Sequence, residues 1–306
     1  MSKESLEINR LEVYKQIEKE LNKTQADINN DIKIVKEWLK TQPHLPEIPE
    51  DRVIESFILF NKFSIERTKQ KLDMYYTIRA TIPEFFNKHP CSPEMVQHAK
   101  VSLIVPLPIL ANDQRRIVYS KFSEDFSPEA FNQENYLAQH FNNMELMIRG
   151  ELFLGIHYIC DCAGFKLGHV SKITPMGLKK TAVGMEKVFS SRVTSIYLIN
   201  FHSYMETPLK FLKSVLPEKI RNRLHLCSDS TELFKAFPKK ILPQDIGGEE
   251  KSVLTLAELW QQEFQNNKAL FDKLMTIRVD ESKRPTKLTN DDILGFHGNF
   301  KKLDVD

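Results

Sequence analysis

The sequence has no hydrophobic stretch long enough to cross a bilayer as a helix. The longest uncharged stretches, such as Val101 to Asn112, are shorter than the roughly 18 apolar residues required, and this one contains Pro106 and Pro108. The first residues, Met1 to Glu4, lead directly into charged sequence, so we expect no signal peptide. We therefore predict a cytoplasmic protein whose contact with membranes is peripheral and transient.

Cysteines are few, and there is little excess charge of either sign. Four cysteines in 306 residues do not predict a disulfide framework, so we expect reduced thiols. A formal charge of +2 argues against a strongly basic nucleic-acid binder, and we predict no nucleic-acid partner. The 41% hydrophobic content is enough for a sizeable core in one large or two medium domains.

Motifs that carry catalytic chemistry are missing as well. The sequence contains no nucleophile elbow, Walker loop, dinucleotide fingerprint or metalloprotease helix. Cys160 and Cys162 place two thiols on one face of a strand, a pattern compatible with a metal or redox site. No second cysteine pair lies nearby, so we favour core packing for both. We expect no enzyme, no cofactor and no metal.

Helical spacing dominates the first part of the chain. Ile28, Ile32, Val35 and Leu39 recur at a helical period and stop before Pro43. A second apolar run, Val53 to Phe60, is followed by a helix that Ser64 can cap and that ends before Pro83. The pattern predicts an all-helical N-terminal module over residues 1–95.

Short β-rich runs begin at Arg116 and alternate with helices. The predicted strands cover residues 117–119, 156–160, 195–199 and 224–227, and Thr174 and Pro175 start one of the intervening helices. Strands that alternate with helices predict an α/β domain with a largely parallel sheet, here over residues 96–265. We expect the more polar tail, residues 266–306, to pack back on the body.

One short helix after the third of these strands is unusually apolar. Thr207 and Pro208 predict its start, Pro217 forces its end, and it carries Leu209 and Leu212. Such a helix is either a buried core helix or a lid over a cavity. Periodicity alone does not separate these two interpretations.

Three segments of the second half resemble the CRAL-TRIO lipid-binding family: Gly155 to Gly164, Tyr197 to Asn200, and Leu242 to Glu249. The ending, Gly295 to Asp306, is similar to insect-type members. The resemblance implies a helical module followed by an α/β domain whose mostly parallel sheet encloses a hydrophobic cavity. It also implies that the segment after Asn200 is a mobile gate, which opens at membranes to exchange cargo.

The resemblance, with the neighbouring helix faces, assigns cargo contact to fifteen positions. They are Leu137, His140, Phe141, Met144, Ile156, Tyr158, Cys160, Thr181, Gly184, Met185, Phe189, Phe201, Met205, Leu209 and Leu212. Two alternatives stay open among them. His140 is either a structural histidine or a polar anchor for the ligand, and Gly184 either permits close helix packing or leaves volume for the cargo.

Five basic residues flank the gate, namely Arg192, Lys213, Lys219, Arg221 and Arg223. Their simplest interpretation is a solvated surface. The alternative is a dock for anionic lipids, because in the tocopherol-transfer branch of the family basic residues in these segments bind phosphoinositide headgroups. Arg192, Lys219 and Arg223 match those positions, whereas Thr194 replaces a basic residue.

Two function classes follow from the resemblance. The first is intracellular binding and transfer of a small hydrophobic ligand, such as a retinoid, tocopherol, carotenoid or phospholipid. The second is a phosphoinositide-sensing or partner-recruiting module without net transport. A lipid-modifying enzyme is a third class, for which the sequence shows no catalytic spacing.

Overall fold

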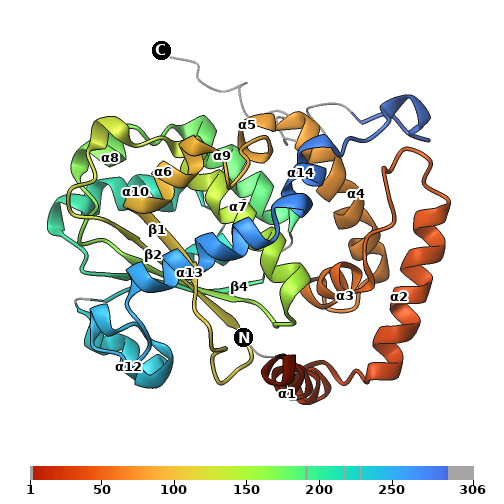
Figure 1. Ribbon diagram of the computed structural model, residues 1–306, viewed down its shortest axis with the longest axis horizontal. Helices are drawn as coiled ribbons and strands as arrows, with labels where there is room; N and C mark the ends of the chain where they lie inside the picture. The colour runs from red at the N-terminus through yellow and green to blue at the C-terminus, as the bar shows by residue number, and fades with distance from the viewer. Residues whose placement is uncertain (1–2, 190–191, 217, 228, 289–306) are drawn as a thin grey trace, which may run out of the picture.

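The computed structural model describes residues 3–189, 192–216, 218–227 and 229–288. A helical N-terminal region comes first, and a sheet with helices on both faces follows (Figure 1). The predicted fold class is confirmed. In the view of Figure 1 the first four helices lie at the right and bottom of the molecule, and the helices that follow the third and fourth strands lie at its upper left.

Six helices precede the first strand: α1 (Lys3–Leu21), α2 (Gln25–Lys40), α3 (Asp51–Phe60), α4 (Ile65–Thr81), α5 (Pro83–Phe86) and α6 (Pro93–Val101). Helix α2 confirms the predicted pattern, because Ile28, Ile32, Val35 and Leu39 are its buried residues. Its start is fixed by a capping box between Thr24 and Asp27. Ser64 precedes α4 as predicted, although its side chain makes no capping hydrogen bond.

The sheet has five strands in the order β1 to β5: β1 (Ser102–Pro106), β2 (Arg116–Phe122), β3 (Ile156–Asp161), β4 (Val193–Ile199) and β5 (Leu224–Leu226). Strand β1 is antiparallel to β2, and the other neighbours are parallel. Strand β1 was not predicted. It begins at Ser102, directly after helix α6, so no turn residues separate the two elements.

The remaining elements connect the strands or follow them. They are η1 (Pro128–Ala130), α7 (Gln133–Gly150), α8 (Leu167–Ser171), α9 (Pro175–Val183), the π-helical turn η2 (Gly184–Val188), η3 (Ser203–Met205), α10 (Glu206–Val215), α11 (Glu218–Arg221), η4 (Ser230–Glu232), α12 (Leu233–Ala236), η5 (Lys239–Ile241), η6 (Gln244–Ile246), α13 (Val253–Asn266), α14 (Lys268–Thr276) and η7 (Glu281–Lys283). Helix α9 begins as predicted, because the Thr174 side chain accepts a hydrogen bond from the Gly177 amide.

Strand alternation gives the sheet two different faces. Val118 and Tyr158 belong to a large core that the sheet shares with α7 and the N-terminal helices. Tyr119 and Ile159, one position further along their strands, belong to a second core that includes residues of α12 and α13. Even-numbered positions of β2 and β3 therefore face one layer, and odd-numbered positions face the other.

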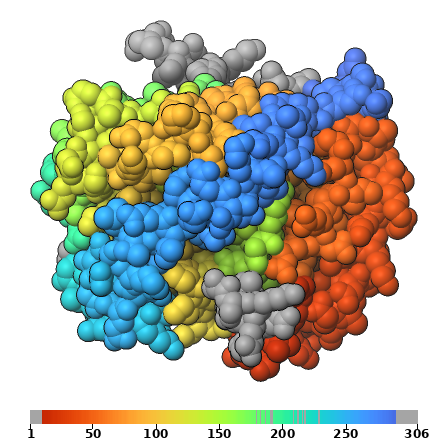
Figure 2. Space-filling view, viewed as in Figure 1, coloured from red at the N-terminus to blue at the C-terminus, as the bar shows by residue number. Residues whose placement is uncertain are grey.

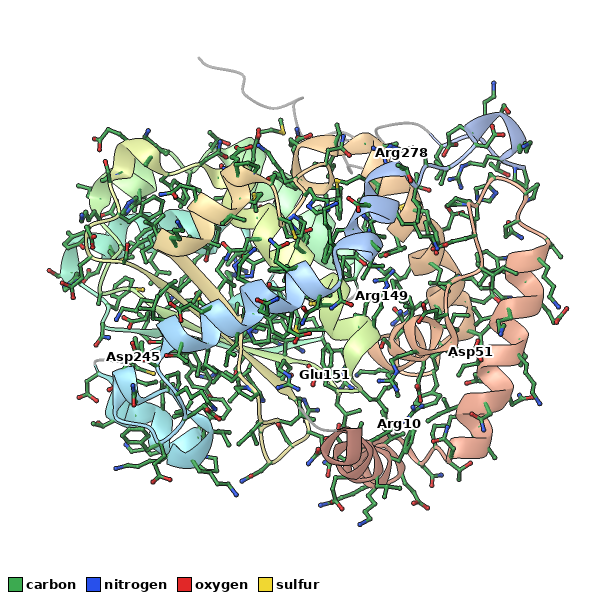
Figure 3. All side chains as sticks on the ribbon, viewed as in Figure 1. Arg10, Asp51, Arg149, Glu151, Asp245 and Arg278 are labelled. Carbon is green, nitrogen blue, oxygen red and sulfur yellow. The ribbon has the colours of Figure 1, made fainter. Side chains whose placement is uncertain are left out.

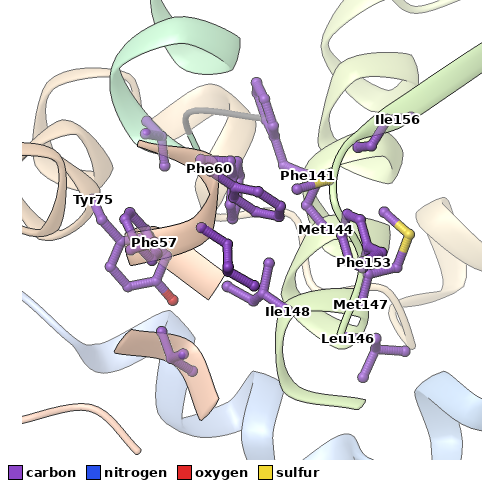
Figure 4. Packing of buried hydrophobic residues seen from close by; sticks show 14 of the residues in the cluster. Phe57, Phe60, Tyr75, Phe141, Met144, Leu146, Met147, Ile148, Phe153 and Ile156 are labelled. Carbon is purple, nitrogen blue, oxygen red and sulfur yellow. The ribbon is translucent and has the colours of Figure 1, made fainter. Parts of the chain in front are cut away.

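The large core joins the N-terminal helices to the sheet domain (Figure 4). The rings of Phe60 and Phe153 lie 5.2 Å apart, and Tyr75 contacts Phe189 at 5.9 Å. A fully buried aromatic side chain contributes about 1.5–3 kcal/mol. Both regions therefore contribute such residues to one hydrophobic cluster. The predicted domain boundary at residue 95 stays a prediction.

A buried ionic cluster lies at the same junction. Glu145 of α7 accepts a hydrogen bond from the Tyr75 hydroxyl at 2.7 Å and pairs with both Arg79 and Arg149. Arg149, labelled in Figure 3, also donates to the Tyr75 hydroxyl at 3.0 Å. Burial alone would raise the pKa of the Glu145 carboxyl, but the two guanidinium groups outweigh it and lower that pKa. The cluster ties α4 to α7.

Helices α13 and α14 form a diagonal band across one face of the molecule (Figure 2). The Trp260 indole of α13 donates to Asn143 of α7 at 2.6 Å. Further along, Arg284 pairs with Asp73 of α4 through two contacts of 2.8 Å. The chain after α14 thus contacts the N-terminal helices as far as it is described, and the insect-type ending, Gly295 to Asp306, lies outside the described residues.

The buried His98 and the half-buried His140 predict a pH dependence of stability. Burial lowers the pKa of His98 and of His140 to about 4, against 6.5 in the unfolded chain. Between these values the unfolded state binds more protons, so stability falls as the pH falls from 6.5 toward 4. The slope is up to about 1.4 kcal/mol per pH unit for each histidine.

We expect His140→Gln to lower this slope in urea unfolding measured from pH 7 to pH 4.5. His202→Gln, which changes an exposed histidine, serves as the control and leaves the slope unchanged. Equal slopes in the wild type and the His140 variant would contradict this account.

Candidate ligand-binding site

A pocket of about 320 Å³ opens at the carboxyl end of the parallel strands. Its floor is formed by Ser120 of β2, Cys160 of β3 and Leu198 of β4, which share the even-numbered face of the sheet. Helices α7, α8 and α9 and the segment after β4 supply the walls. Its volume lies at the lower end of the range of about 300–1,000 Å³ that is typical of small-molecule sites.

Six of the fifteen predicted cargo positions line this pocket: Leu137, Cys160, Thr181, Phe201, Met205 and Leu209. Eight others do not: His140, Phe141, Met144, Ile156, Tyr158, Gly184, Met185 and Phe189. The side chain of Leu212, within α10, lies outside the described residues. Contact with a cargo stays a prediction for all fifteen.

Aromatic packing fills the region where several of the remaining positions lie. Phe86 of α5 stacks on Phe141 with ring centroids 5.0 Å apart, and Phe141 stacks on Phe189 at 5.8 Å. Phe85 adds a further contact to Phe141 at 5.9 Å. The N-terminal helices therefore occupy the space beside Phe141, and the pocket is restricted to the carboxyl end of the strands.

Gly184 lies at this aromatic cluster, in the first position of the π-helical turn η2. A Cβ atom placed on it would lie 2.5 Å from Cζ of Phe141, which is too close for any side chain without movement. Of the two alternatives for Gly184, close packing and space for a cargo, the structure shows close packing against Phe141. The glycine lets the Phe141 ring approach the backbone of the turn.

Asp161 fixes the start of the gate segment. Its carboxylate accepts hydrogen bonds from the Tyr119 hydroxyl at 2.8 Å, the Asn200 side-chain amide at 2.9 Å and the Ala163 amide at 3.0 Å. Asn200 has a φ of 52°, a left-handed conformation that asparagine tolerates better than most residues. The turn that directs the chain from β4 toward the gate is thus held by a buried side chain.

The predicted gate covers the pocket with η3 and α10. Met205 and Leu209 are buried against it, and the Tyr204 hydroxyl donates to the Phe165 carbonyl at 2.7 Å. The helix begins before the predicted start at Thr207 and Pro208, because α10 begins at Glu206 and continues directly from η3. Tyr204 therefore holds the gate segment to the loop before α8.

Comparison with known proteins identifies this architecture. Residues 102–248, which include the whole sheet and the gate, match the family model described as the CRAL/TRIO domain. This part of the chain belongs to the CRAL/TRIO family. Residues 24–95 match a second family model, described as a Pinta-like UBA domain, so the N-terminal part of this CRAL/TRIO protein also has relatives of its own.

Two kinds of curated relative resemble this CRAL/TRIO protein. The human alpha-tocopherol transfer protein-like protein is 25% identical over 213 residues, which cover 68% of this chain and 61% of the relative. Clavesin-2 from Rattus norvegicus is 26% identical over 263 residues, which cover 81% of this chain and 75% of that relative. The crystal structure of Sfh5 matches over 79% of this chain and 96% of the Sfh5 chain, with a TM-score of 0.52 and 10% sequence identity. This similarity shows a shared fold alone.

The five predicted headgroup residues lie on different elements of the CRAL/TRIO domain. Arg192 and Arg223 lie at the amino ends of β4 and β5, where Arg223 donates to the Val193 carbonyl. Lys219 and Arg221 are exposed on α11, and Lys213 is half-buried on α10. Their binding of phosphoinositides stays a prediction.

Arg192 belongs to a cluster that the sequence analysis did not foresee. Burial lowers the pKa of its guanidinium, Arg115 and Arg223 add to that effect, and Glu20 opposes it. Glu20 of α1 pairs with Arg115 through contacts of 2.9 and 3.2 Å. Because Glu20 and Arg115 are 95 residues apart and neither lies in a motif, no local sequence signal could have joined them to Arg192.

A Ser–His–Asp hydrogen-bond chain occurs on the opposite face of the sheet. His157 contacts Ser195 Oγ through Nδ1 at 2.6 Å and Asp113 through Nε2 at 3.0 Å. Ser195 is buried, the Phe237 ring packs on the His157 ring at 5.1 Å, and neither described pocket includes the serine. This chain of contacts links β3, β4 and the loop before β2.

Cys160 and Cys162 both line the pocket, and burial raises the pKa of each thiol. Among the described residues, no group of three or more His, Cys, Asp or Glu side chains is placed to hold a metal ion. The same part of the chain contains no helix that is long and apolar enough to span a membrane.

Proposed function

We propose that this protein carries one small hydrophobic molecule and exchanges it at membranes. The pocket between the carboxyl ends of β2 to β4 and the gate segment supports this proposal, because most of its lining residues are apolar. The name of the human relative, alpha-tocopherol transfer protein-like, agrees with such a role. Retinoids, tocopherols, carotenoids and phospholipids are the candidate cargo classes.

Burial of apolar surface is sufficient to hold such a cargo. Removing about 400 Å² of apolar ligand surface from water yields on the order of 10 kcal/mol, before the costs of ordering the ligand and the gate are subtracted. This interaction needs no covalent step. Carriage therefore requires only a pocket of suitable shape and a way to open it.

Opening of the gate is favoured at a membrane and disfavoured in water. Exposing Met205 and Leu209 costs roughly 1.5–3 kcal/mol for each side chain. Three large apolar side chains on the surrounding elements are already exposed: Leu167 of α8 by 58%, Met176 of α9 by 47% and Tyr204 of η3 by 45%. A bilayer surface would cover these side chains and offset the cost of opening.

We further propose that the basic residues beside the gate attract anionic lipids. Each lysine or arginine near an anionic surface contributes about 1 kcal/mol. We expect Lys219→Glu combined with Arg221→Glu to weaken binding to phosphoinositide-containing vesicles by about tenfold or more in a sedimentation assay. Lys235→Glu with Lys240→Glu, which makes the same charge change at exposed sites elsewhere, is the control.

Equal loss of vesicle binding in both double variants would mean that total charge, and not this surface, controls docking.

Transfer between vesicles tests the main proposal. A fluorescent hydrophobic cargo in donor vesicles should move to acceptor vesicles faster in the presence of catalytic amounts of the protein. Recruitment to vesicles without any acceleration of transfer would contradict carriage and favour the sensing module.

A further inference from the structure

Three polar side chains lie next to one another on the wall of a pocket whose lining is mostly apolar. Ser120 of β2 and Cys160 of β3 are direct neighbours in the sheet register, and Tyr136 of α7 lies opposite them. Burial raises the pKa of the Tyr136 hydroxyl and of the Cys160 thiol, and the neighbouring Ser120 hydroxyl partly opposes this rise in both. Among the described residues the side chains of Ser120 and Tyr136 have no other polar partner, so both retain the capacity to bond a ligand.

The charged residues of the pocket are directed away from this group. Lys121 and Asp161 line the pocket, but strand alternation places their side chains on the face opposite to Ser120 and Cys160. The Asp161 carboxylate is also engaged by Tyr119 and Asn200. An anionic head placed beside Ser120 would therefore be buried without a cation to neutralise it, which is costly.

We propose that Tyr136, with Ser120 and Cys160, forms a polar anchor that selects a neutral cargo carrying a hydroxyl or carbonyl group. The inference rests on the proposed function, since it assumes that the pocket holds a cargo. The apolar remainder of the molecule would then extend toward Met205 and Leu209 of the gate. Fatty acids and phosphorylated lipids would bind this pocket poorly.

The ionisation state of Tyr136 agrees with this role. Burial raises the pKa of its hydroxyl, so that it stays neutral and able to donate a hydrogen bond throughout the physiological pH range. His140, one helical turn further along α7, contacts the Tyr136 ring edge to face with centroids 4.9 Å apart. This contact helps to fix the orientation of the Tyr136 ring, and His140 does not itself line the pocket.

Three linear C18 probes test the anchor: oleyl alcohol, oleate and 1-octadecene. Each would compete with a fluorescent apolar probe for the full-length protein at pH 7.4. An unsatisfied buried polar group costs enough to change affinity by about five- to a hundredfold. We expect oleyl alcohol to bind at least about fivefold more tightly than either the alkene or the carboxylate.

The variant Tyr136→Phe keeps the ring and removes only the hydroxyl. We expect it to weaken oleyl alcohol binding about fivefold or more and to leave 1-octadecene binding unchanged. Tyr197→Phe is the matched control, because Tyr197 packs on the opposite face of the sheet and does not line the pocket. The control should bind all three probes as the wild type does.

The outcomes separate the anchor from the proposed function. Equal affinities for alcohol and alkene in the wild type, or an equal loss for both in Tyr136→Phe, would overturn the anchor while carriage stands. Oleate binding as tight as that of the alcohol would also overturn it. Failure of all three probes to bind would instead count against the proposed function itself.

Discussion

Glu145→Gln is expected to destabilise the protein by about 3–5 kcal/mol. The substitution removes the carboxylate that pairs with Arg79 and Arg149 and leaves two guanidinium groups buried without a counter-charge. Both flanking helices, α4 and α7, depend on this contact, so we expect the N-terminal region and the sheet domain to loosen together. The free energy of unfolding from urea titration measures the effect.

The pH dependence of the same variant provides a second measurement. Because the pKa of Glu145 is lowered in the folded state, its stabilising contribution is complete above the unfolded value near 4.5 and is lost as the pH falls through the folded value. The free energy of unfolding of Glu145→Gln should not show this decrease at acid pH.

Glu37→Gln, in the exposed pair with Lys40, is the control and should leave stability unchanged within error. A Glu145→Gln protein as stable as this control would show that the buried cluster contributes nothing to the fold.

Thr181→Trp is expected to weaken binding of any apolar ligand by about a hundredfold or more. Thr181 projects from α9 into the pocket, where an indole ring would take the volume that the cargo needs. The only described hydrogen bond of the Thr181 hydroxyl is to the Gly177 carbonyl of its own helix, at 2.7 Å, so the loss to the fold is small. Displacement of a fluorescent apolar probe measures the affinity, and thermal unfolding shows that the variant remains folded.

Met176→Trp is the matched control, because Met176 lies on the same helix and is exposed. It should bind the probe like the wild type. Unchanged affinity in Thr181→Trp would place the ligand elsewhere, and loss of affinity in both variants would point to a general disturbance of α9.

Local sequence patterns predicted most of the fold. The spacing of Ile28 to Leu39, the Thr174 cap and the alternation of strands and helices all correspond to elements of the structure. These signals depend on residues within a few positions of one another. The antiparallel strand β1 was not predicted. It lies at the edge of the sheet, a position that tolerates Pro106, whereas a proline argues against an interior strand.

The extent of the pocket could not be predicted in the same way. Phe85 and Phe86 fill the space beside Phe141 from a helix more than fifty residues away, and only the tertiary fold brings these rings together. Ser120 and Leu198, by contrast, share the face of Cys160 through strand alternation. An inspection of alternate positions in the predicted strand 195–199 would have found Leu198, whereas Ser120 lies one residue beyond the predicted strand 117–119.

The central claim is that the pocket between the sheet and the gate holds a hydrophobic molecule. Native mass spectrometry of the protein after incubation with mixed neutral lipid vesicles tests this claim most directly. We predict one bound apolar molecule per chain in the wild type and none in Thr181→Trp. A wild-type protein that shows no added mass, or an equal amount of bound molecule in both proteins, would contradict the account.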